Sequence, residues 1–252
     1  MPYQERVPDQ LFDEKGHYLG RPADFNDRII ERKLRLVYKI PGFVGKEYTL
    51  MDIGCGNGAY MLRLAGKMKS CLGLEISDEH LSQFNDFRVK NNITNSECMI
   101  TNIEKSEPPI IADRILSFEV IEHLTSEDSL AFYYKALKKD GLMVITVPNK
   151  WWIFETHGAN LPWFQWNRVP FFSWLPRAIH ERYAHARIYT KKRIISLLEK
   201  HGFTILSAEY VTAPMDMLPN GAFKNFMIHT FFKNDTTRIP FKSTSIFVVA
   251  KK

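Results

Sequence analysis

The sequence predicts one α/β domain built around a mostly parallel sheet, and three observations support this fold class. The chain has 252 residues, of which 45% are hydrophobic and 25% charged, which is the composition of an ordinary globular protein. From Tyr48 onward, short β-rich runs alternate with segments of helical periodicity, as in parallel strands joined by crossover helices. Glycine-rich or acidic residues follow several of these runs, where strands would end. Disordered, collagen-like and coiled-coil chains are excluded by the same composition.

Composition and charge exclude further classes of protein. The longest apolar runs, such as 141–148, fall far short of the roughly 20 residues that cross a bilayer. The first ten residues carry charges where a signal peptide would be apolar, so we expect a cytoplasmic location. A net charge of +6 permits contact with phosphate or anionic lipid without requiring it. The cysteines are too few for a disulfide framework, so reduced thiols are expected at Cys55, Cys71 and Cys98.

Seven strands are expected from the β-rich runs. Each run is bounded by turn residues or by a helical pattern, which separates it from the next. Prolines, an asparagine and a glycine between the last two runs predict a long loop over 212–243. The expected strands are 48–53, 71–76, 97–103, 112–118, 141–147, 204–211 and 244–250.

Helices are expected between and beside these strands. A helix over 24–39 follows a polar arm. Thr125 with Asp128 three residues later forms a capping box that opens another helix, and a helix over 190–201 ends at Gly202. The helix over 24–39 has an apolar face of Ile29, Ile30, Leu34 and Val37, and two further helices have faces formed by Met61, Leu64, Ala65 and Met68 and by Leu81 and Phe84.

All five tryptophans lie in one segment, 149–189, that breaks the alternation. The segment follows the carboxyl end of a strand, where open α/β sheets place their ligand crevice. We therefore expect an amino-terminal arm and capping helix over 1–47 and a domain over 48–252, in which 149–189 is a lid insertion for the substrate. The tryptophans are Trp151, Trp152, Trp163, Trp166 and Trp174.

The first strand runs into a glycine-rich turn, LMDIGCGNG over residues 50–58. Glycine lets the backbone approach a ligand where a Cβ would collide. Glu75 ends the next strand 21 residues after Gly54, and a carboxylate there can accept hydrogen bonds from both hydroxyls of a ribose. The spacing of Gly54, Gly56 and Ala59 also satisfies a dinucleotide pattern, so these residues alone leave a nicotinamide cofactor open. A tight turn that binds nothing is the simplest alternative.

Five motifs follow one another along the chain between residues 50 and 149. They are LMDIGCGNG, LGLEIS, ITNIEKS, SFEVIEHL and LKKDGLMVITVPN. With these motifs the chain resembles the class I S-adenosylmethionine-dependent methyltransferases, particularly the broad group that includes ubiquinone-biosynthesis O-methyltransferases. The resemblance covers most of residues 48–212. It implies a Rossmann-like sheet of seven strands with the last one antiparallel and S-adenosylmethionine as the cofactor, and the aromatic-rich insertion would then form a lid over the active site.

The resemblance also implies a set of cofactor-binding residues. In the family, the acid that matches Asp52 helps to hold the methionine amino group, and the acid that matches Glu75 binds the ribose. The first adenine position is usually Asp, and this chain has Asn102, whose amide can still bond to the exocyclic amine. The complete expected set is Asp52, Gly54, Gly56, Glu75, Ile76, Asn102, Ile103, Phe118 and Glu119.

The expected reaction is transfer of a methyl group to oxygen on a small-molecule or lipid-like acceptor. A sulfonium carries its charge beside the methyl group, so the protein needs chiefly to align a nucleophile and to exclude water. A hydroxyl nucleophile also needs a base. Three alternatives stay open from the sequence: an RNA methyltransferase, a nicotinamide-dependent oxidoreductase and a non-catalytic cofactor-binding protein.

Candidates for the base and for a metal follow the fourth strand. Glu122, His123 and the more distant His185 are the expected catalytic residues. The E-x-x-E-H arrangement of Glu119, Glu122 and His123 looks like the metal-binding motif of small-RNA 2′-O-methyltransferases and of some ubiquinone-pathway O-methyltransferases, with His185 completing the set. Such ligands suit Mg, Mn or Zn. A base that needs no metal, and a carboxylate that only caps a helix, are equally open. His157 is expected to be structural or solvated.

The aromatic insertion admits three interpretations. Its side chains could form the small core of a lid, line a pocket for a large apolar substrate, or rest in a lipid interface as a peripheral membrane contact. Nucleic acid is not an expected partner, because a charge of +6 is modest and no RNA-binding module is visible. The sequence does not indicate an oligomeric state.

Overall fold

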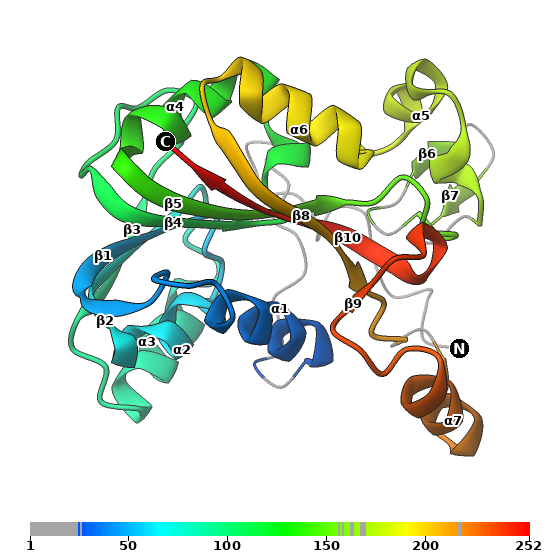
Figure 1. The fold of residues 1–252 in the computed structure, drawn as a ribbon, viewed down its shortest axis with the longest axis horizontal. Coiled ribbons are helices and arrows are strands. Elements are labelled where there is room, and N and C mark those ends of the chain that lie inside the picture. Colours follow the sequence, from blue (N-terminus) through cyan, green and yellow to red (C-terminus); the bar gives the residue numbers. More distant parts are fainter. Residues whose placement is uncertain are drawn as a thin grey trace.

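A computed structural model describes residues 25, 27–155, 157, 159–161, 164–166, 170–215 and 218–252, with side chains at all of these except 160, 161 and 164–166. Its centre is an eight-stranded sheet with helices on both faces (Figure 1). The sheet strands are β1 (Gly45–Ile53), β2 (Met68–Glu75), β3 (Ser96–Ile100), β4 (Ala112–Phe118), β5 (Leu137–Pro148), β8 (Thr204–Thr212), β9 (Thr236–Thr237) and β10 (Ser243–Lys251), in the order β3-β2-β1-β4-β5-β10-β8-β9.

The pairing of the strands confirms the expected α/β class. Neighbouring strands from β3 to β5 are parallel, whereas β10 runs antiparallel to both β5 and β8. The seven expected strands are all present, and the two-residue strand β9 adds an eighth at the edge by pairing with β8. A strand of two residues is too short to show an alternation of hydrophobic and polar side chains, so the sequence pattern could not reveal β9.

The helices form two layers over the sheet. Helices α1 (Arg28–Tyr38), α2 (Met61–Leu64) and α3 (Leu81–Lys90) cover one face, and α4 (Leu130–Ala136) and α6 (Lys191–Lys200) cover the other (Figure 1). Successive strand residues point to opposite faces, and so Leu50 and Met51 of β1 lie in two different core clusters. The sheet therefore has a buried core on each side.

The insertion and the segment before β10 add small elements at one end of the molecule (Figure 1). The insertion holds a ribbon of β6 (Ala159–Leu161) and β7 (Phe164–Trp166), followed by α5 (Arg177–Tyr183). The segment before β10 holds α7 (Ala222–Thr230), where a long loop was expected. That expectation was wrong because α7 has apolar side chains on two faces, with Ile228 buried and Phe223 and Phe226 exposed, and so lacks the polar face by which an amphipathic helix is recognised. No helix in the described ranges is long and apolar enough to cross a membrane.

Two local expectations also differ from the structure. The helix expected to include Met68 ends at Leu64 and continues as one 3-10 turn, since Gly66 disfavours a longer helix and Met68 already belongs to β2. The expected capping box is absent: the Ser126 hydroxyl accepts the Asp128 N–H at 3.1 Å. The Thr125 hydroxyl instead donates to the Glu104 carboxylate at 2.9 Å, which draws it away from the helix.

The expected ends of α6 are confirmed. The Thr190 hydroxyl accepts the Arg193 N–H at 3.2 Å and caps the helix at its start. Gly202 follows the last turn with a φ of 91°, a conformation that favours glycine. All three cysteines are free thiols.

Candidate active site

The glycine-rich turn lies between the carboxyl end of β1 and the start of α2. The N–H groups of Gly54 and Cys55 both donate to the carbonyl of Leu74, at 2.7 and 3.2 Å, and so fix the turn to the end of β2. Gly54 has a φ of 71°, and a Cβ there would lie 2.3 Å from a methyl group of Val120. Gly56 has a φ of 53°, but nothing lies within 4 Å of the position of its missing Cβ. At Gly56 the turn therefore presents bare backbone to open space, as a ligand cradle requires, whereas at Gly54 a side chain is excluded by Val120.

Two carboxylates flank this turn in different states. Oδ2 of Asp52, a residue that is 2% exposed, has no hydrogen-bond partner within the described ranges. Burial, with the charge of Glu75, raises the pKa of Asp52 well above its usual value. Glu75 is held by two N–H donors, that of Gly56 at 2.7 Å and that of Ile76 at 2.8 Å. A buried carboxylate left without a partner is costly, and such groups concentrate at ligand sites.

The remaining residues expected at the cofactor follow the ends of the neighbouring strands β3 and β4. Asn102 and Ile103 are half-buried, and the Asn102 side-chain oxygen accepts the Glu104 N–H at 2.9 Å. Phe118 is buried, with its ring edge-on to Tyr60 at a centroid distance of 4.6 Å. The sheet order β3-β2-β1-β4 brings these strand ends side by side with the glycine turn.

Glu119, which is partly buried, is joined to the amino-terminal helix by an ion pair with the buried Lys33. Its Oε1 accepts hydrogen bonds from Nζ of Lys33 at 2.8 Å and from the Thr146 hydroxyl at 2.9 Å. Burial raises the pKa of Glu119, but the charge and hydrogen bond of Lys33 outweigh it and lower this pKa to about 2. Burial lowers the pKa of Lys33, but the charge and hydrogen bond of Glu119 raise it by more, so the pKa of Lys33 lies above its usual value. Both groups are therefore charged at neutral pH.

Lys33 was not among the expected site residues, although the sequence holds a signal for it. It lies three residues after Ile30 and four before Val37, on the apolar stripe of α1, where a charged residue needs a buried partner. The side chain of Arg32 is buried next to it and donates to the carbonyls of Thr212 and Ala213, both at 2.7 Å. Helix α1 is therefore anchored at two places by buried cations.

Glu122, His123 and His157 form a cluster of an acid and two imidazoles. Each offers an atom within 4.8 Å of the others. Glu122 is 2% exposed, and within the described ranges neither of its oxygens has a hydrogen-bond partner. Its Oε1 lies 3.6 Å from His157 Nε2 and 4.0 Å from His123 Nε2.

Burial sets the protonation of this cluster. It raises the pKa of Glu122 well above the usual value, and the charge of Glu119 adds to the rise. It lowers the pKa of His123 well below the usual value, and His157 adds to the fall. Burial therefore favours the neutral forms of both Glu122 and His123.

Glu155 and His180 position His157 from within the insertion. The Glu155 carboxylate contacts His180 Nε2 at 2.6 Å, and both side chains are almost completely buried. Its other oxygen accepts the His157 backbone N–H at 3.0 Å and lies 3.8 Å from His157 Nδ1. His157 was expected to be structural or solvated, but its Nε2 faces Glu122 instead. No local pattern reveals this, since His157 reaches Glu122 only through long-range packing.

His185 and Glu119 lie outside the acid and imidazole cluster that the described residues form. Burial lowers the pKa of His185. The backbone of His185 is hydrogen-bonded to the ring of His123. The adjoining chain is fixed to the end of β4, where the Arg187 N–H donates to the carbonyl of Glu122 at 3.1 Å. Of the four residues expected as metal ligands, the structure therefore groups Glu122 and His123, with His157 beside them.

Comparisons with known proteins agree with this geometry. A family model described as "Methyltransferase domain" matches residues 3–208. The ubiquinone biosynthesis O-methyltransferase of Pelagibacter ubique is 27% identical over 140 residues, which are 54% of this chain and 54% of that protein. The tRNA U34 carboxymethyltransferase of Actinobacillus succinogenes is 30% identical over 103 residues, 40% of this chain and 32% of the relative. The chain spans at most about half the length of these curated relatives.

Solved structures show the same fold. An S-adenosylmethionine-dependent methyltransferase from Mesorhizobium loti has a TM-score of 0.62 at 15% identity, with 91% of this chain and all of that chain covered. Coclaurine N-methyltransferase, bound to N-methylheliamine and SAH, has a TM-score of 0.57 at 17% identity, with 89% and 72% covered. The resemblance found in the five motifs is confirmed, and the chain belongs to the methyltransferase domain family, with the fold of the S-adenosylmethionine-dependent methyltransferases.

Proposed function

We propose that the protein transfers a methyl group from S-adenosylmethionine to oxygen on a small-molecule or lipid-like acceptor. The observation that carries the proposal is the buried Asp52 carboxylate, which has no hydrogen-bond partner for Oδ2 within the described ranges and lies beside a glycine turn that opens on free space. A dinucleotide cofactor would use the same turn, but membership of the methyltransferase domain family favours the methyl donor.

The residues around the turn fit the donor. Asp52 would pair with the amino group of the methionine moiety, because a buried carboxylate without a partner is stabilised by a cation. Glu75, already oriented by two backbone N–H groups, would bind the ribose, and the bare backbone of Gly54 and Gly56 would lie against the ligand. Ile76, Asn102 and Ile103 would border the adenine, and Phe118 and Glu119 the methionine end. When bound, the donor supplies an electrophilic methyl group on a sulfonium.

On the acceptor side, His157 is the proton acceptor that we propose. Its Nδ1 lies near the Glu155 carboxylate, which can stabilise the protonated ring, and Glu155 is itself fixed by His180. Glu122 and the neutral His123 border the same space and would orient the acceptor hydroxyl. His185 would act through its backbone, by holding the ring of His123.

A metal at this cluster is a second proposal. One carboxylate and two imidazoles within 4.8 Å of one another form a ligand set suited to Zn or Mn. The unpartnered oxygens of Glu122 favour this alternative, since a cation would satisfy them. Elemental analysis of the purified protein, followed by titration of Zn and Mn into Glu122→Gln and the unsubstituted chain, separates a metal site from a metal-free base.

The decisive experiment combines a labelled methyl donor with fractionated cell extract. Label in a small-molecule or lipid fraction is expected, and label in RNA alone would contradict the proposal. Calorimetry with S-adenosylhomocysteine should detect binding, whereas affinity for NAD without affinity for that ligand would indicate an oxidoreductase. Binding without transfer to any fraction would indicate a non-catalytic protein.

Substitutions then test the proton acceptor. His157→Ala should lower kcat by about a hundredfold, the usual loss when a general base is removed. His185→Ala should change it little, because only the backbone of that residue is used. His123→Ala tests the alternative base. Full activity in both His157→Ala and His123→Ala would exclude a histidine base at this cluster.

A further inference from the structure

Helix α7 carries large apolar side chains on both its inner and its outer face. On the inner face, Ile228 packs with Trp152 in a small core cluster that also holds Phe232, just after the helix. On the outer face, Phe223 is 66% and Phe226 55% exposed. A helix that only covered a small core would present polar side chains to water. The outer face of α7 would therefore be more stable in contact with a second apolar environment than in water.

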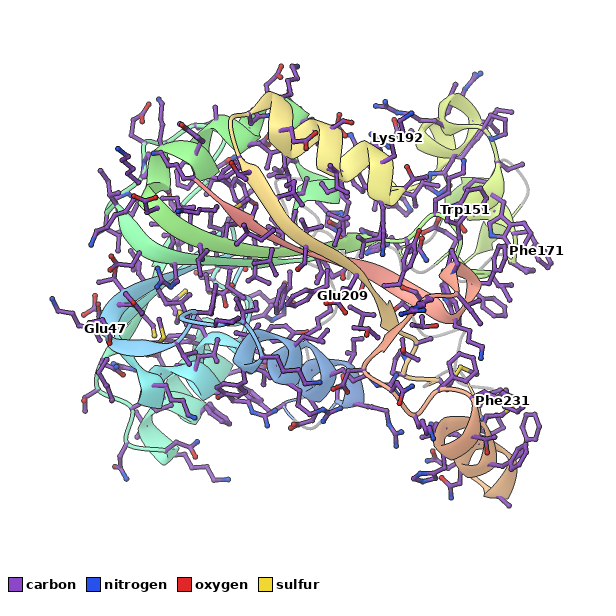
Figure 2. All side chains as sticks on the ribbon, viewed as in Figure 1. Glu47, Trp151, Phe171, Lys192, Glu209 and Phe231 are labelled. Atoms are coloured by element: carbon purple, nitrogen blue, oxygen red, sulfur yellow. The ribbon has the colours of Figure 1, made fainter. Side chains whose placement is uncertain are left out.

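Further exposed aromatic and apolar side chains continue this face. The ring of Phe226 lies 6.0 Å from that of Phe231, and the ring of Phe241 lies 5.4 Å from that of Trp174, which in turn contacts Phe171. Figure 2 shows Phe231, Phe171 and Trp151 at the same end of the molecule. We call this surface the aromatic end. It comprises Phe171, Trp174, Phe223, Phe226, Phe231, Ile239 and Phe241, which are 37% to 66% exposed.

The segment that carries α7 is rich in positive charge. Residues 218–242 hold four Lys and Arg residues against a single acid, Asp235. Asp235 is already ion-paired with Arg35 at 2.6 Å and with Lys39 at 3.2 Å, so it does not offset the charge around α7. The four cationic residues are Lys224, Lys233, Arg238 and Lys242.

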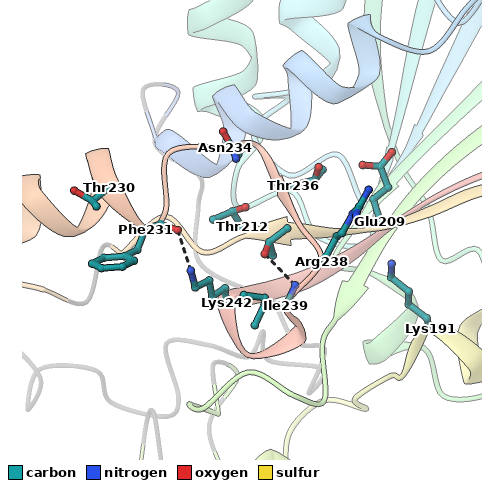
Figure 3. Close-up of a pocket in the computed structure, with 11 residues that line it drawn as sticks. Lys191, Glu209, Thr212, Thr230, Phe231, Asn234, Thr236, Arg238, Ile239 and Lys242 are labelled. Carbon is teal, nitrogen blue, oxygen red and sulfur yellow. Dashed lines mark hydrogen bonds between the residues drawn. The ribbon is translucent and has the colours of Figure 1, made fainter.

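A hollow of about 870 Å³ opens beside these residues (Figure 3). Arg238 and Lys242 stand on its wall with several threonine hydroxyls, and Glu209 is a carboxylate on the same wall. Phe231 and Ile239 belong both to the hollow and to the aromatic end. Cations and hydroxyl donors next to exposed aromatics are the groups that bind a phosphate at the boundary between water and hydrocarbon.

We propose that the aromatic end docks on an anionic phospholipid surface. The aromatic rings would rest in the interfacial layer, where amphipathic and aromatic side chains are favoured, and the four cations would meet lipid phosphates, with the hollow receiving a head group. The carboxyl ends of the parallel strands, which carry the candidate active site, point toward this same end (Figure 1). Docking needs no methyl transfer and so stands apart from the proposed function.

Vesicle co-sedimentation tests this surface. The unsubstituted chain should bind vesicles of phosphatidylglycerol and phosphatidylcholine and leave vesicles of phosphatidylcholine alone largely unbound. Phe223→Ser with Phe226→Ser should weaken binding to the anionic vesicles by about tenfold or more, because two buried phenyl groups are lost. Ile110→Ser with Ile111→Ser is the matched control, since these side chains are also exposed but precede β4, at the amino ends of the strands.

Separate measurements test the contribution of charge to vesicle binding and the integrity of the fold in each variant. Lys224→Glu with Lys233→Glu should also weaken binding, and added salt should weaken it further in the unsubstituted chain. Unchanged thermal unfolding and unchanged binding of S-adenosylhomocysteine in each variant show that the fold and the proposed function are intact.

Four results would overturn the proposal. They are absence of binding to the anionic vesicles, an equal loss in the Ile110 and Ile111 control, a dimer in light scattering that Phe223→Ser with Phe226→Ser converts to a monomer, and binding of soluble glycerol phosphate by a chain that ignores vesicles. The third result would assign the face to a second copy of the chain, and the fourth would assign the hollow to a free anion.

Discussion

Two carboxylates of the candidate site, one buried and one partly buried, stand in opposite states. On the cradle side, Asp52 is buried with no hydrogen-bond partner for Oδ2 in the described ranges, and its pKa is raised. At the end of β4, Glu119 is bonded to Lys33 and Thr146, and its pKa falls to about 2. The first arrangement costs stability in the free protein, while the second joins α1 to the end of β4 across 86 residues of sequence. One carboxylate is thus suited to a ligand and the other to the fold.

The largest effect is expected from removal of Lys33, the cation that pairs with Glu119. Lys33→Met should lower the free energy of unfolding by about 3 kcal/mol, because it leaves a charged carboxylate in a largely buried place without its partner. Urea denaturation measures the loss. Arg35→Met, which breaks an exposed ion pair of the same helix, is the control and should cost about 1 kcal/mol or less. Equal losses in the two variants would show that the Lys33–Glu119 pair stabilises the fold no more than an exposed ion pair does.

Acid should remove the contribution of Glu119 to stability. Its folded pKa of about 2 lies below the unfolded value of about 4.3, so the contribution is present above the unfolded value and is lost as the pH falls toward 2. The difference in unfolding free energy between the unsubstituted chain and Glu119→Gln should therefore shrink by about 2 kcal/mol from pH 6 to about pH 2. A difference that stays constant with pH would show that the carboxylate is not held in its charged form.

Asp52→Asn should change ligand affinity and stability in opposite directions. Affinity for S-adenosylhomocysteine should fall by about 2 kcal/mol through loss of a charge-assisted contact, while stability near neutral pH should rise by about 1 kcal/mol. The rise follows from the raised pKa, since charging Asp52 above its unfolded pKa destabilises the folded state.

A matched control for Asp52 is Asp113, whose pKa is lowered to about 2 by Lys138 and Thr49 despite some burial. Asp113→Asn should reduce stability, so the two substitutions should have opposite signs. Calorimetry and thermal unfolding of both variants give the comparison. A loss of stability in both would mean that Asp52 has a partner in the folded protein.

The smallest effect is expected at Gly56. Gly56→Ala should cost about 1 kcal/mol of stability, because alanine disfavours a φ of 53° while nothing within 4 Å opposes its Cβ. The free energy of binding S-adenosylhomocysteine should change by more than the free energy of unfolding, because the methyl group of the new alanine would fill the space above the turn. Gly66→Ala, in a 3-10 turn with free space around it, should change neither quantity appreciably.

The same contrast explains which parts of the site the sequence could predict. The cradle is made by a strand, a turn of glycines and an acid at the next strand end, so Asp52, Gly54 and Glu75 stand close in sequence and in a fixed order. Lys33 and His157 come to the site from distant segments, through packing that no spacing records. Their positions depend on the whole sheet being formed.

The fold shows the same limit. The strands β1 to β5 were predicted because each is a continuous β-rich run, and β4 agrees with its expected bounds at both ends. Helix α7 was missed because it has two apolar faces. One face packs inside the protein around Ile228, and the other, with Phe223 and Phe226, is exposed. A pattern based on a single buried face cannot describe such a helix.

The position of β10 between β5 and β8 has a consequence for biosynthesis. Because β8 pairs with β10 and, at two residues, with β9, it meets no long neighbour until a later part of the chain has left the ribosome. Before β10 is synthesised, β5 therefore has an unpaired edge and β8 lacks its long partner, and the two parts of the sheet join when β10 enters between them.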